Sequence, residues 1–367
     1  MERVKNLVVG AGLAGAVTAE RIASIKKEPV LIIDRRNHIA GNIFDYKDQK
    51  TGITVHKYGP HVFHTNSEKV WKYLSQFTEW HNFMYKVIAV VDGEFVNIPF
   101  NFNSLYKIFP KTLALRYEEK LLQNFEYGKK IPILELKKTN DLDLKNLADF
   151  IYKKVFYGYT IKQWGSKPEE LDHEVSARVP ILLSSDNRYF QDRYQAIPKY
   201  GYTSLVKNIL DNHLIEVRLN TDFKDIKNKI SYDNLYFSGA IDEYYDYQYG
   251  ELPYRSLDIK FKTITKEYYQ VGPQINYPEN YDFTRSVEYK YYLDEKSLST
   301  IISEEYPVPY MRDKNERFYP VPMLRNQVIY NKYLKIPSNT KFIGRLGTYK
   351  YLNMDQIVEN ILENETR

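Results

Sequence analysis

Three glycines near the start of the chain have the spacing of a phosphate-binding turn. Gly10, Gly12 and Gly15 form a GxGxxG motif directly after a short apolar run. Gly10 permits a tight turn, Gly12 lets a pyrophosphate approach the backbone, and Gly15 lets the next helix pack closely on the strands. The free N–H groups of that helix, which begins at Leu13, would face the phosphates. The motif therefore predicts a bound dinucleotide.

The residues after the second expected strand indicate which dinucleotide is favoured. Asp34 ends that strand and can accept hydrogen bonds from both ribose hydroxyls. Its negative charge would repel the 2′-phosphate of NADP, although Arg35, the next residue, would attract it. Ala40-Gly41-Asn42 then resembles the second glycine motif of FAD proteins of the glutathione-reductase type, with alanine in place of the first glycine. This signal favours FAD over NAD.

The end of the chain contains a further segment typical of such flavoproteins. Residues 341–343 are expected to form a strand, 344–347 a glycine-containing turn and 353–362 a helix. In this class the last strand and helix return to the first domain, and the helix start can stabilise negative charge on a reduced flavin. We therefore expect a discontinuous cofactor domain that the C-terminus closes.

Composition limits the other chemistries. The chain of 367 residues has no cysteine, which excludes a cysteine nucleophile, a thiolate metal site and an iron–sulfur cluster. His61-x-x-His64 has zinc-ligand spacing, but no third ligand with metal spacing follows nearby, so no metal is expected. The net charge of +5 is spread without blocks, which gives no reason to expect nucleic acid. The absence of cysteine makes a cytoplasmic protein the default expectation. A mean hydropathy of −0.54 and short apolar runs predict a soluble protein without stable membrane insertion.

The middle of the chain alternates between helical and strand patterns. Residues 67–77 and 201–211 are predicted to be helices, and residues 86–98 a hairpin that turns at Asp92-Gly93. Three further helical patterns cover residues 103–109, 112–125 and 143–157. Strands are expected at residues 214–219, 234–237 (an apparent edge of the cofactor sheet), 257–261, 268–271, 287–292 and 299–303.

Together these elements predict an α/β protein with a Rossmann-like FAD-binding domain of the glutathione-reductase type, a small helical domain and a mostly antiparallel β-sheet domain. We expect residues 1–66, 200–245 and 325–367 to form the FAD-binding domain. Residues 103–170 would form the helical substrate domain, and residues 78–102, 171–199 and 246–324 the antiparallel sheet domain. A flavin between the first domain and the sheet would define the site.

Six blocks of residues carry a more specific signal. They lie, in order, at 59–65 (GPHVFHT), 158–165 (GYTIKQWG), 197–203 (IPKYGYT), 247–250 with 254–257 (YQYG and YRSL), 283–285 (FTR) and 344–351 (GRLGTYKY). Together they resemble the bacterial UDP-galactopyranose mutase family nearly from end to end. The resemblance implies a flavin-dependent isomerase that interconverts UDP-galactopyranose and UDP-galactofuranose with no net oxidation. In that family only reduced FAD is active, and its N5 attacks the anomeric carbon and displaces UDP.

The resemblance also implies the site residues. His61, Arg178 and Arg285 are expected to be catalytic, the arginines by holding the diphosphate. The helical domain is then the uridine-binding one. The implied substrate-binding set is Phe156, Tyr159, Thr160, Trp164, Arg178, Tyr189, Arg255, Asn276, Arg285, Tyr319 and Tyr351. The implied cofactor-binding set is Gly10, Gly12, Leu13, Gly15, Asp34, Arg35, Gly41, Asn42, His61, Arg345, Tyr351, Asn353 and Met354.

Three of these residues have more specific expected roles. Tyr159 matches the position that stacks on uracil. Arg178 lies in a polar stretch, residues 165–186, that is expected to close over the substrate and exclude water. His61 is expected beside the flavin, where it would tune N5 through its backbone more than by proton transfer.

Four positions depart from the family pattern: Tyr85, Val155, Tyr289 and Asn353. Tyr85 stands where many members carry Asn near the sugar, and Asn353 where many carry Asp near the flavin. The sugar and the nucleotide therefore stay open, because relatives in this superfamily act on UDP-N-acetylgalactosamine or on dTDP-6-deoxy sugars such as fucose.

Two other classes of protein remain as alternatives to the mutase interpretation. An FAD-dependent amine oxidase or desaturase on the same fold would usually need an apolar tunnel, whereas paired arginines and 35 tyrosines fit a diphosphate and a sugar. A non-catalytic nucleotide-sugar binder would keep the flavin as a structural element. The resemblance further implies a homodimer and a cellular reductant for the flavin.

Overall fold

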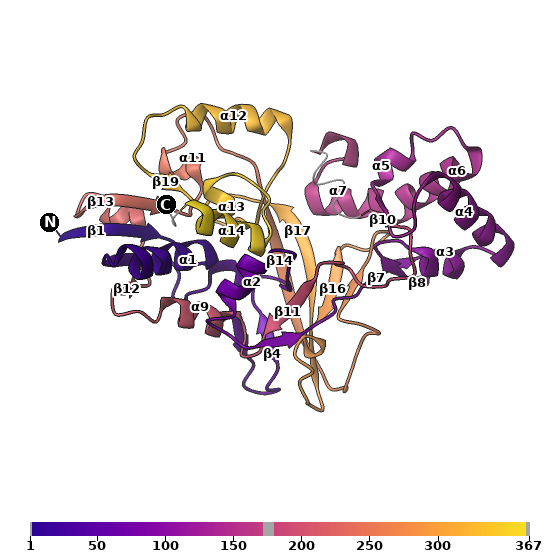
Figure 1. The fold of residues 1–367 in the computed structure, drawn as a ribbon, viewed down its shortest axis with the longest axis horizontal. Coiled ribbons are helices and arrows are strands. Elements are labelled where there is room, and N and C mark those ends of the chain that lie inside the picture. Colours follow the sequence, from indigo (N-terminus) through magenta and orange to yellow (C-terminus); the bar gives the residue numbers. More distant parts are fainter. Residues whose placement is uncertain (1, 172–179, 365–367) are drawn as a thin grey trace.

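The computed structural model describes residues 2–171 and 180–364. Its first layer is a five-stranded parallel sheet in the order β12-β2-β1-β13-β19 (Figure 1). The strands are β1 (Glu2–Val9), β2 (Val30–Ile33), β12 (Ile215–Arg218), β13 (Ile230–Phe237) and β19 (Lys341–Phe342). The expected strand, glycine turn, helix and strand at the start of the chain are confirmed, and the C-terminal strand joins the same sheet.

Helices cover both faces of this sheet. Val8, Ile32 and Tyr236 are buried in the main core on the side of α1 (Leu13–Arg21), which continues as a π-helical turn to Lys26. Leu7, Leu31 and Leu235 alternate with them and form a second core on the opposite face. Two helices pack against α1, namely α9 (Tyr202–Leu210) and α14 (Met354–Asn364).

A seven-stranded sheet forms the centre of the molecule, in the order β18-β14-β17-β16-β15-β7-β8. Every neighbouring pair is antiparallel except β15 and β7. The strands are β7 (Val87–Val91), β8 (Glu94–Ile98), β14 (Tyr254–Ile264), β15 (Gln274–Asn276), β16 (Arg285–Glu288), β17 (Thr300–Pro309) and β18 (Tyr319–Pro320). The hairpin prediction is confirmed, since Asp92 and Gly93 have the left-handed φ angles of 49° and 83° that its two-residue turn requires.

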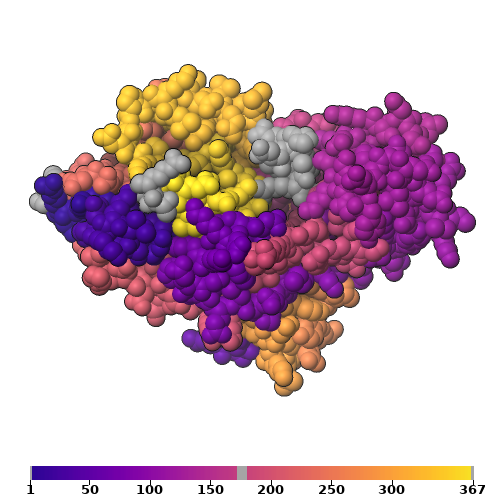
Figure 2. Space-filling view, in the orientation of Figure 1, coloured from indigo at the N-terminus to yellow at the C-terminus, as the bar shows by residue number. Residues whose placement is uncertain are grey.

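A helical lobe extends beyond β7 and β8, on the right of Figures 1 and 2. Its core includes Leu144, Leu147 and Ile151, which lie at helical spacing, and the side chain of Asp141 caps the helix that carries them. The lobe comprises α3 (Phe102–Ile108), α4 (Lys111–Asn124), α5 (Ile133–Leu136), α6 (Leu142–Ile151), a π-helical segment (Tyr152–Tyr157) and α7 (Gly158–Trp164).

Shorter elements connect these layers. Three small sheets contain β3 (Asp45–Lys47) with β4 (Thr54–His56), β9 (Lys130–Ile131) with β10 (Ile181–Leu182), and β5 (Phe63–Thr65), β11 (Tyr194–Pro198) and β6 (Trp80–Asn82). The other α-helices are α2 (Glu68–Leu74), α10 (Phe223–Ile226), α11 (Ile241–Tyr244), α12 (Leu324–Leu334) and α13 (Gly344–Gly347). The boundaries of the three expected domains stay a prediction.

Two strand predictions are wrong in whole or in part, and a third segment is a strand as predicted but not at the expected place in the sheet. Residues 268–271 form bends, because the N–H groups of Tyr269 and Gln270 donate to the Glu288 carboxylate instead of to a strand. The expected strand at 287–292 ends at Glu288 and continues as a 3-10 turn, Tyr289–Tyr291. The segment at 234–237 is no edge, since β13 lies between β1 and β19.

Across residues 2–171 and 180–364, no helix is both long and apolar enough to cross a membrane.

Candidate cofactor and substrate site

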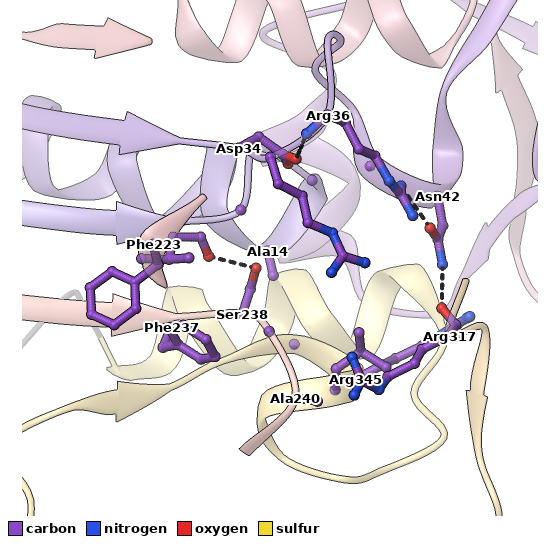
Figure 3. A pocket seen from close by; sticks show the side chains of 18 of the residues that line it. Ala14, Asp34, Arg36, Asn42, Phe223, Phe237, Ser238, Ala240, Arg317 and Arg345 are labelled. Carbon is purple, nitrogen blue, oxygen red and sulfur yellow. Dashed lines mark hydrogen bonds between the residues drawn. The ribbon is translucent and has the colours of Figure 1, made fainter. Parts of the chain in front are cut away.

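A cavity of about 250 Å³ lies along the carboxyl ends of the parallel strands, and we call it the cofactor cavity. Figure 3 shows its wall, with Asp34 and Arg36 at the end of β2, Ser238 after β13 and Arg345 on α13. Most of the predicted cofactor set lines this cavity: Gly10, Gly12, Leu13, Asp34, Arg35, Gly41, Asn42, His61, Arg345 and Met354. Gly15, Tyr351 and Asn353 stand outside the lining that the described residues form.

The three motif glycines have three different surroundings. A Cβ on Gly15 would lie 1.8 Å from the Gly10 carbonyl oxygen, so Gly15 is required by the packing of α1 on β1. Gly10 has a φ of 99° and would meet Ser238 Oγ at 2.0 Å. A Cβ on Gly12 would meet protein only at an ordinary 3.6 Å, yet Gly12 lines the cavity. Internal packing therefore leaves room at Gly12, on the side where a pyrophosphate would approach.

The two glycine motifs contact each other directly. A Cβ on Gly41 would approach the Gly12 Cα to 2.9 Å, and Gly41 has a left-handed φ of 54°. Ala40, which replaces the first glycine of the second FAD motif, also has a left-handed φ, of 72°, and its N–H donates to the Ala11 carbonyl at 2.8 Å. The second motif therefore forms a cradle with the first, as a dinucleotide site needs.

Asp34 organises the loops that meet at the cavity. Its Oδ2 accepts the N–H of Ala11 at 2.8 Å, and its Oδ1 accepts the N–H of Arg36 at 2.9 Å. Each carboxylate oxygen keeps a further lone pair, so ribose hydroxyls can still be accepted. Arg35 and Arg36 both pair with Glu316, at 3.0 and 2.9 Å.

A strap formed by Glu316 and Arg317 crosses the cavity wall, and the sequence patterns missed it. Arg317 pairs with Glu243 on α11 at 2.5 Å, and its carbonyl accepts a hydrogen bond from Asn42. Glu243 also pairs with Lys224 at 2.9 Å. These residues lie in segments without a glycine signature, so only the fold brings them to the cofactor cavity.

His61 lines the cofactor cavity and lies close enough to Arg285, on β16 of the seven-stranded sheet, to interact with it electrostatically. Its Nδ1 donates to the Gly59 carbonyl at 2.9 Å, and its own backbone N–H donates to His56 Nδ1 at 3.0 Å. Burial, together with nearby His56 and Arg345, lowers the pKa of His61 well below its usual 6.5. The ring is therefore neutral at pH 7, which fits an environmental role beside a flavin better than proton donation.

Arg285 pairs with a carboxylate that the sequence analysis did not single out. Its Nε donates to Glu305 Oε2 at 2.6 Å, across the register pair of β16 and β17. The Glu305 side chain is fully buried and the Arg285 side chain is 17% exposed. Burial raises the pKa of Glu305, against the effect of the guanidinium. Glu305 lies two and four residues after Ser303 and Ile301, so it shares one face of β17 with these buried residues, and this spacing was the available signal.

Several tyrosines surround this ion pair, and we call the group the Arg285 cluster. Tyr85, Tyr159 and Tyr319 interact electrostatically with Arg285, and Tyr189 interacts with Tyr85 and Tyr159. Burial raises the pKa of Tyr319 to about 12, so its hydroxyl stays protonated at pH 7. The cluster thus gathers neutral hydroxyl donors around one cation, an arrangement that suits a diphosphate.

Aromatic rings connect the Arg285 cluster with the cofactor cavity. Trp164 lies edge-on to Tyr351, with ring centroids 5.4 Å apart, and Tyr351 lies 5.4 Å from Tyr319. The Arg345 guanidinium is 5.4 Å from the Tyr351 ring and also lines the cofactor cavity. Predicted substrate and cofactor residues are therefore neighbours in space.

The remaining predicted substrate residues lie at the edges of this region. Asn276 is the register partner of Arg285 and accepts a hydrogen bond from Gln274 at 2.8 Å. Arg255 donates to the carbonyls of Gln163 and Lys162, so it secures the end of α7. Phe156 is buried in the main core and Thr160 lies on α7. Arg178 lies outside the described residues.

The four departures have different surroundings. The Tyr85 hydroxyl donates to Gln274 Oε1 at 2.5 Å and accepts from Tyr292 at 3.2 Å. Tyr289 is fully buried beside His56, and Val155 is buried in the helical lobe. Asn353 precedes α14 at the cavity end. Of these, only Tyr85 belongs to the Arg285 cluster. Within the described part of the chain, no group of acidic or histidine side chains could hold a metal ion.

Comparison with known proteins defines the class first. Residues 8–77 match an NAD(P)-binding Rossmann-like domain. A crystal structure of reduced UDP-galactopyranose mutase shares the fold with a TM-score of 0.75 and 14% identity, covering 99% of this chain and 93% of that one. Putrescine oxidase, a structure studied for redesign of its cofactor binding, matches with a TM-score of 0.61 at 8% identity, over 99% and 98%. The protein therefore contains an NAD(P)-binding Rossmann-like domain and shares the fold of these two structures.

The particular family follows from the sequence comparisons. Residues 154–351 match the UDP-galactopyranose mutase family. The UDP-galactopyranose mutase of Mycoplasma genitalium is 34% identical over 371 residues, covering 96% of this chain and 91% of the relative. The dTDP-fucopyranose mutase of Escherichia coli is also 34% identical, over 98% and 97%. The chain belongs to the UDP-galactopyranose mutase family, a family of isomerases that act on nucleotide sugars.

Proposed function

We propose that this protein interconverts UDP-galactopyranose and UDP-galactofuranose with FAD in its reduced form. The observation that carries the proposal is the adjacency of two sites, a dinucleotide cradle and a cluster of phenols around Arg285, joined through Arg345 and Tyr351. When bound, reduced FAD supplies an electron-rich N5 as the nucleophile toward the anomeric carbon of the sugar.

The protein's own residues would hold the two ends of the substrate. We assign Arg285, which forms an ion pair with Glu305, to the departing diphosphate. The hydroxyls of Tyr189 and Tyr319 would donate further hydrogen bonds to the same group. Tyr159 and Trp164 on α7 are assigned to the uridine. Tyr159 would stack on the uracil, and Trp164 would lie beside it. These groups orient the pyrophosphate without touching the reacting carbon, which leaves the chemistry to the cofactor.

The cofactor cavity would hold FAD as an extended dinucleotide. Gly12 and Gly41 would face the pyrophosphate, and Asp34 the ribose. His61 and the first turn of α14 at Met354 would flank the isoalloxazine, because both line the cavity together with Arg345, with which His61 interacts electrostatically. The positive end of that helix favours the anionic reduced ring. A cellular reductant and a homodimeric assembly are part of the proposal.

A second candidate is the same ring contraction on a dTDP-6-deoxyhexose or on UDP-N-acetylgalactopyranose. The dTDP-fucopyranose mutase relative favours the first of these, since its identity to this chain equals that of the galactopyranose mutase relative. Tyr85 is a second reason to consider a different sugar. Its ring lies in the Arg285 cluster, and its hydroxyl is already hydrogen-bonded to Gln274 and Tyr292.

Product analysis distinguishes these substrates. Dithionite-reduced protein is incubated separately with UDP-galactofuranose, UDP-N-acetylgalactofuranose and dTDP-fucofuranose, and the products are separated by chromatography. We expect the highest kcat/KM for UDP-galactofuranose. A preference for either of the other two sugars moves the assignment to that sugar, and oxygen consumption with an amine in place of furanose-to-pyranose conversion supports an oxidase.

A further inference from the structure

One lysine of α7 is enclosed by backbone carbonyls. Lys162 Nζ donates to the carbonyls of Tyr277, Glu279, Tyr281 and Phe283, the last three at 3.1, 3.1 and 3.2 Å. All four belong to one segment, residues 277–283, which we call the carbonyl loop. An ammonium group has three N–H donors, so these four acceptors use its whole hydrogen-bonding capacity.

Two further residues on the same helical face contact this loop. Lys154, Gly158 and Lys162 are spaced by four residues, which places them in one row along a continuous helix. Lys154 pairs with Glu279 at 2.8 Å and with Asp92. A Cβ on Gly158 would lie 2.2 Å from the Pro278 carbonyl oxygen. The helix therefore contacts the carbonyl loop at three successive positions, from Lys154 to Lys162.

The two docked segments carry the two halves of the proposed substrate site. The helix carries Tyr159 and Trp164, which are assigned to the uridine. The carbonyl loop lies between Asn276 and Arg285 and leads into β16 only two residues after Phe283. The distance between the uridine surface and the diphosphate arginine thus depends on how the helix sits on this loop.

We propose that Lys162 is a positioning residue, which, by anchoring α7 to the carbonyl loop, fixes the uridine-binding residues at the correct distance from Arg285. This inference rests on the proposed function of the site. Lys162 does not contact the diphosphate, because its donors are used by the loop. Burial lowers the pKa of Lys162 to about 8, whereas the four carbonyls favour the charged form, so the ammonium is present at pH 7.

Binding of UDP alone tests the proposal without turnover. Lys162→Met keeps much of the aliphatic stem and removes the ammonium, and Lys153→Met on the same helical segment is the matched control, because Lys153 is exposed. UDP affinity of the FAD-loaded protein is measured by titration calorimetry. We expect Lys162→Met to weaken UDP binding at least tenfold and to raise KM more than it lowers kcat. The control should match the unaltered protein.

A second variant separates positioning from loss of folding. Lys162→Arg keeps the positive charge and several donors, so it should recover part of the lost UDP affinity. Thermal unfolding and the ratio of flavin to protein are recorded for every variant. If the Lys162→Met variant does not fold, Lys162→Arg still tests the proposal. Its UDP affinity should be measurable and weaker than that of the unaltered protein.

The outcomes separate this inference from the proposed function. If the unaltered protein binds no UDP, the function proposed for the site is wrong. If it binds UDP and both Lys162 variants bind it equally well, the function stands and the positioning role is overturned. Equal weakening by Lys153→Met would also overturn it, because a surface charge would then have the same effect.

Discussion

Arg285 and Glu305 form an ion pair, with Nε and Oε2 2.6 Å apart, at the centre of the seven-stranded sheet. Glu305 Oε1 has no hydrogen-bond partner among the described residues, and a Cβ on Gly59 would lie 3.1 Å from it. The pair therefore lies directly beneath the loop that carries His61. Because the Glu305 carboxylate balances the Arg285 guanidinium, a bound substrate diphosphate would share Arg285 with Glu305.

Removing the carboxylate should destabilise the empty protein in particular. We expect Glu305→Ala to lower the free energy of unfolding by about 3–5 kcal/mol, because the Arg285 charge is left buried without a partner. Saturating UDP should restore part of this loss, since a diphosphate supplies negative charge. The measurement is Tm with and without UDP, with Glu305→Gln as a milder variant. The same UDP-induced rise in Tm in all three proteins would contradict this assignment of Arg285.

Arg285 itself should affect turnover and leave the cofactor in place. We expect Arg285→Ala to lose at least about 100-fold in kcat/KM, because a preorganised cation at the leaving group is worth several kcal/mol. The flavin absorbance should be unchanged, since Arg285 is not among the residues that line the cofactor cavity. Arg325→Ala, an exposed arginine on α12, is the control. Unchanged turnover would remove Arg285 from the diphosphate site.

The contact between the two glycine motifs predicts a cofactor defect. Gly41→Ala would place a Cβ 2.9 Å from the Gly12 Cα on a left-handed backbone, so the purified protein should contain far less than one flavin per chain. Gly52→Ala is the matched control, because Gly52 has a φ of 72° with nothing within 4 Å of its Cβ position. The ratio of flavin to protein absorbance checks this. Equal flavin content in both variants would argue against the cradle.

Two buried histidines predict loss of stability in acid. Burial lowers the pKa of both His56 and His61 below 6.5, so the unfolded chain takes up protons that the folded chain excludes. Stability should be full above pH 6.5 and fall as the pH drops below it, by up to about 1.4 kcal/mol per pH unit for each histidine. Denaturant unfolding between pH 7 and 5 measures this slope.

One substitution isolates the contribution of His56. His56→Gln keeps an acceptor for the His61 N–H and cannot titrate, so it should reduce the acid slope by about half. His213→Gln, at an exposed histidine, should leave the slope unchanged. An unaltered slope in His56→Gln would show that His56 is not excluded from protonation in the folded chain.

Local sequence patterns correctly predicted those elements whose backbone conformation is determined by the residue types within the element itself. The turn at Asp92-Gly93 and the glycine motif at residues 10–15 require backbone conformations that few residue types allow, so they could be read directly. Residues 268–271 alternate like a strand, but Tyr268, Tyr269 and Val271 are exposed and the nearby Glu288 carboxylate takes the N–H groups. That contact spans 19 residues, and no local pattern contains it.

The residues of the candidate site also divide into those that local sequence patterns reveal and those that depend on contacts between distant parts of the chain. Most of the expected cofactor residues meet in one cavity because the glycine motifs themselves build it. Glu305 and the Glu316–Arg317 strap depend on pairing between strands and loops far apart in the chain, so their partners became visible only in the fold. The strand order around β13 is likewise a property of the whole sheet.

The dependence of turnover on the flavin's redox state tests the central claim most directly. The purified protein is assayed with UDP-galactofuranose, once as the oxidised holoprotein and once after reduction with dithionite, under exclusion of oxygen. The account predicts that the reduced protein converts UDP-galactofuranose to UDP-galactopyranose by ring expansion and that the oxidised protein does so at least 100-fold more slowly, because only the reduced N5 is nucleophilic. Equal rates in both states, or a colourless protein that cannot be reconstituted with FAD, would contradict it.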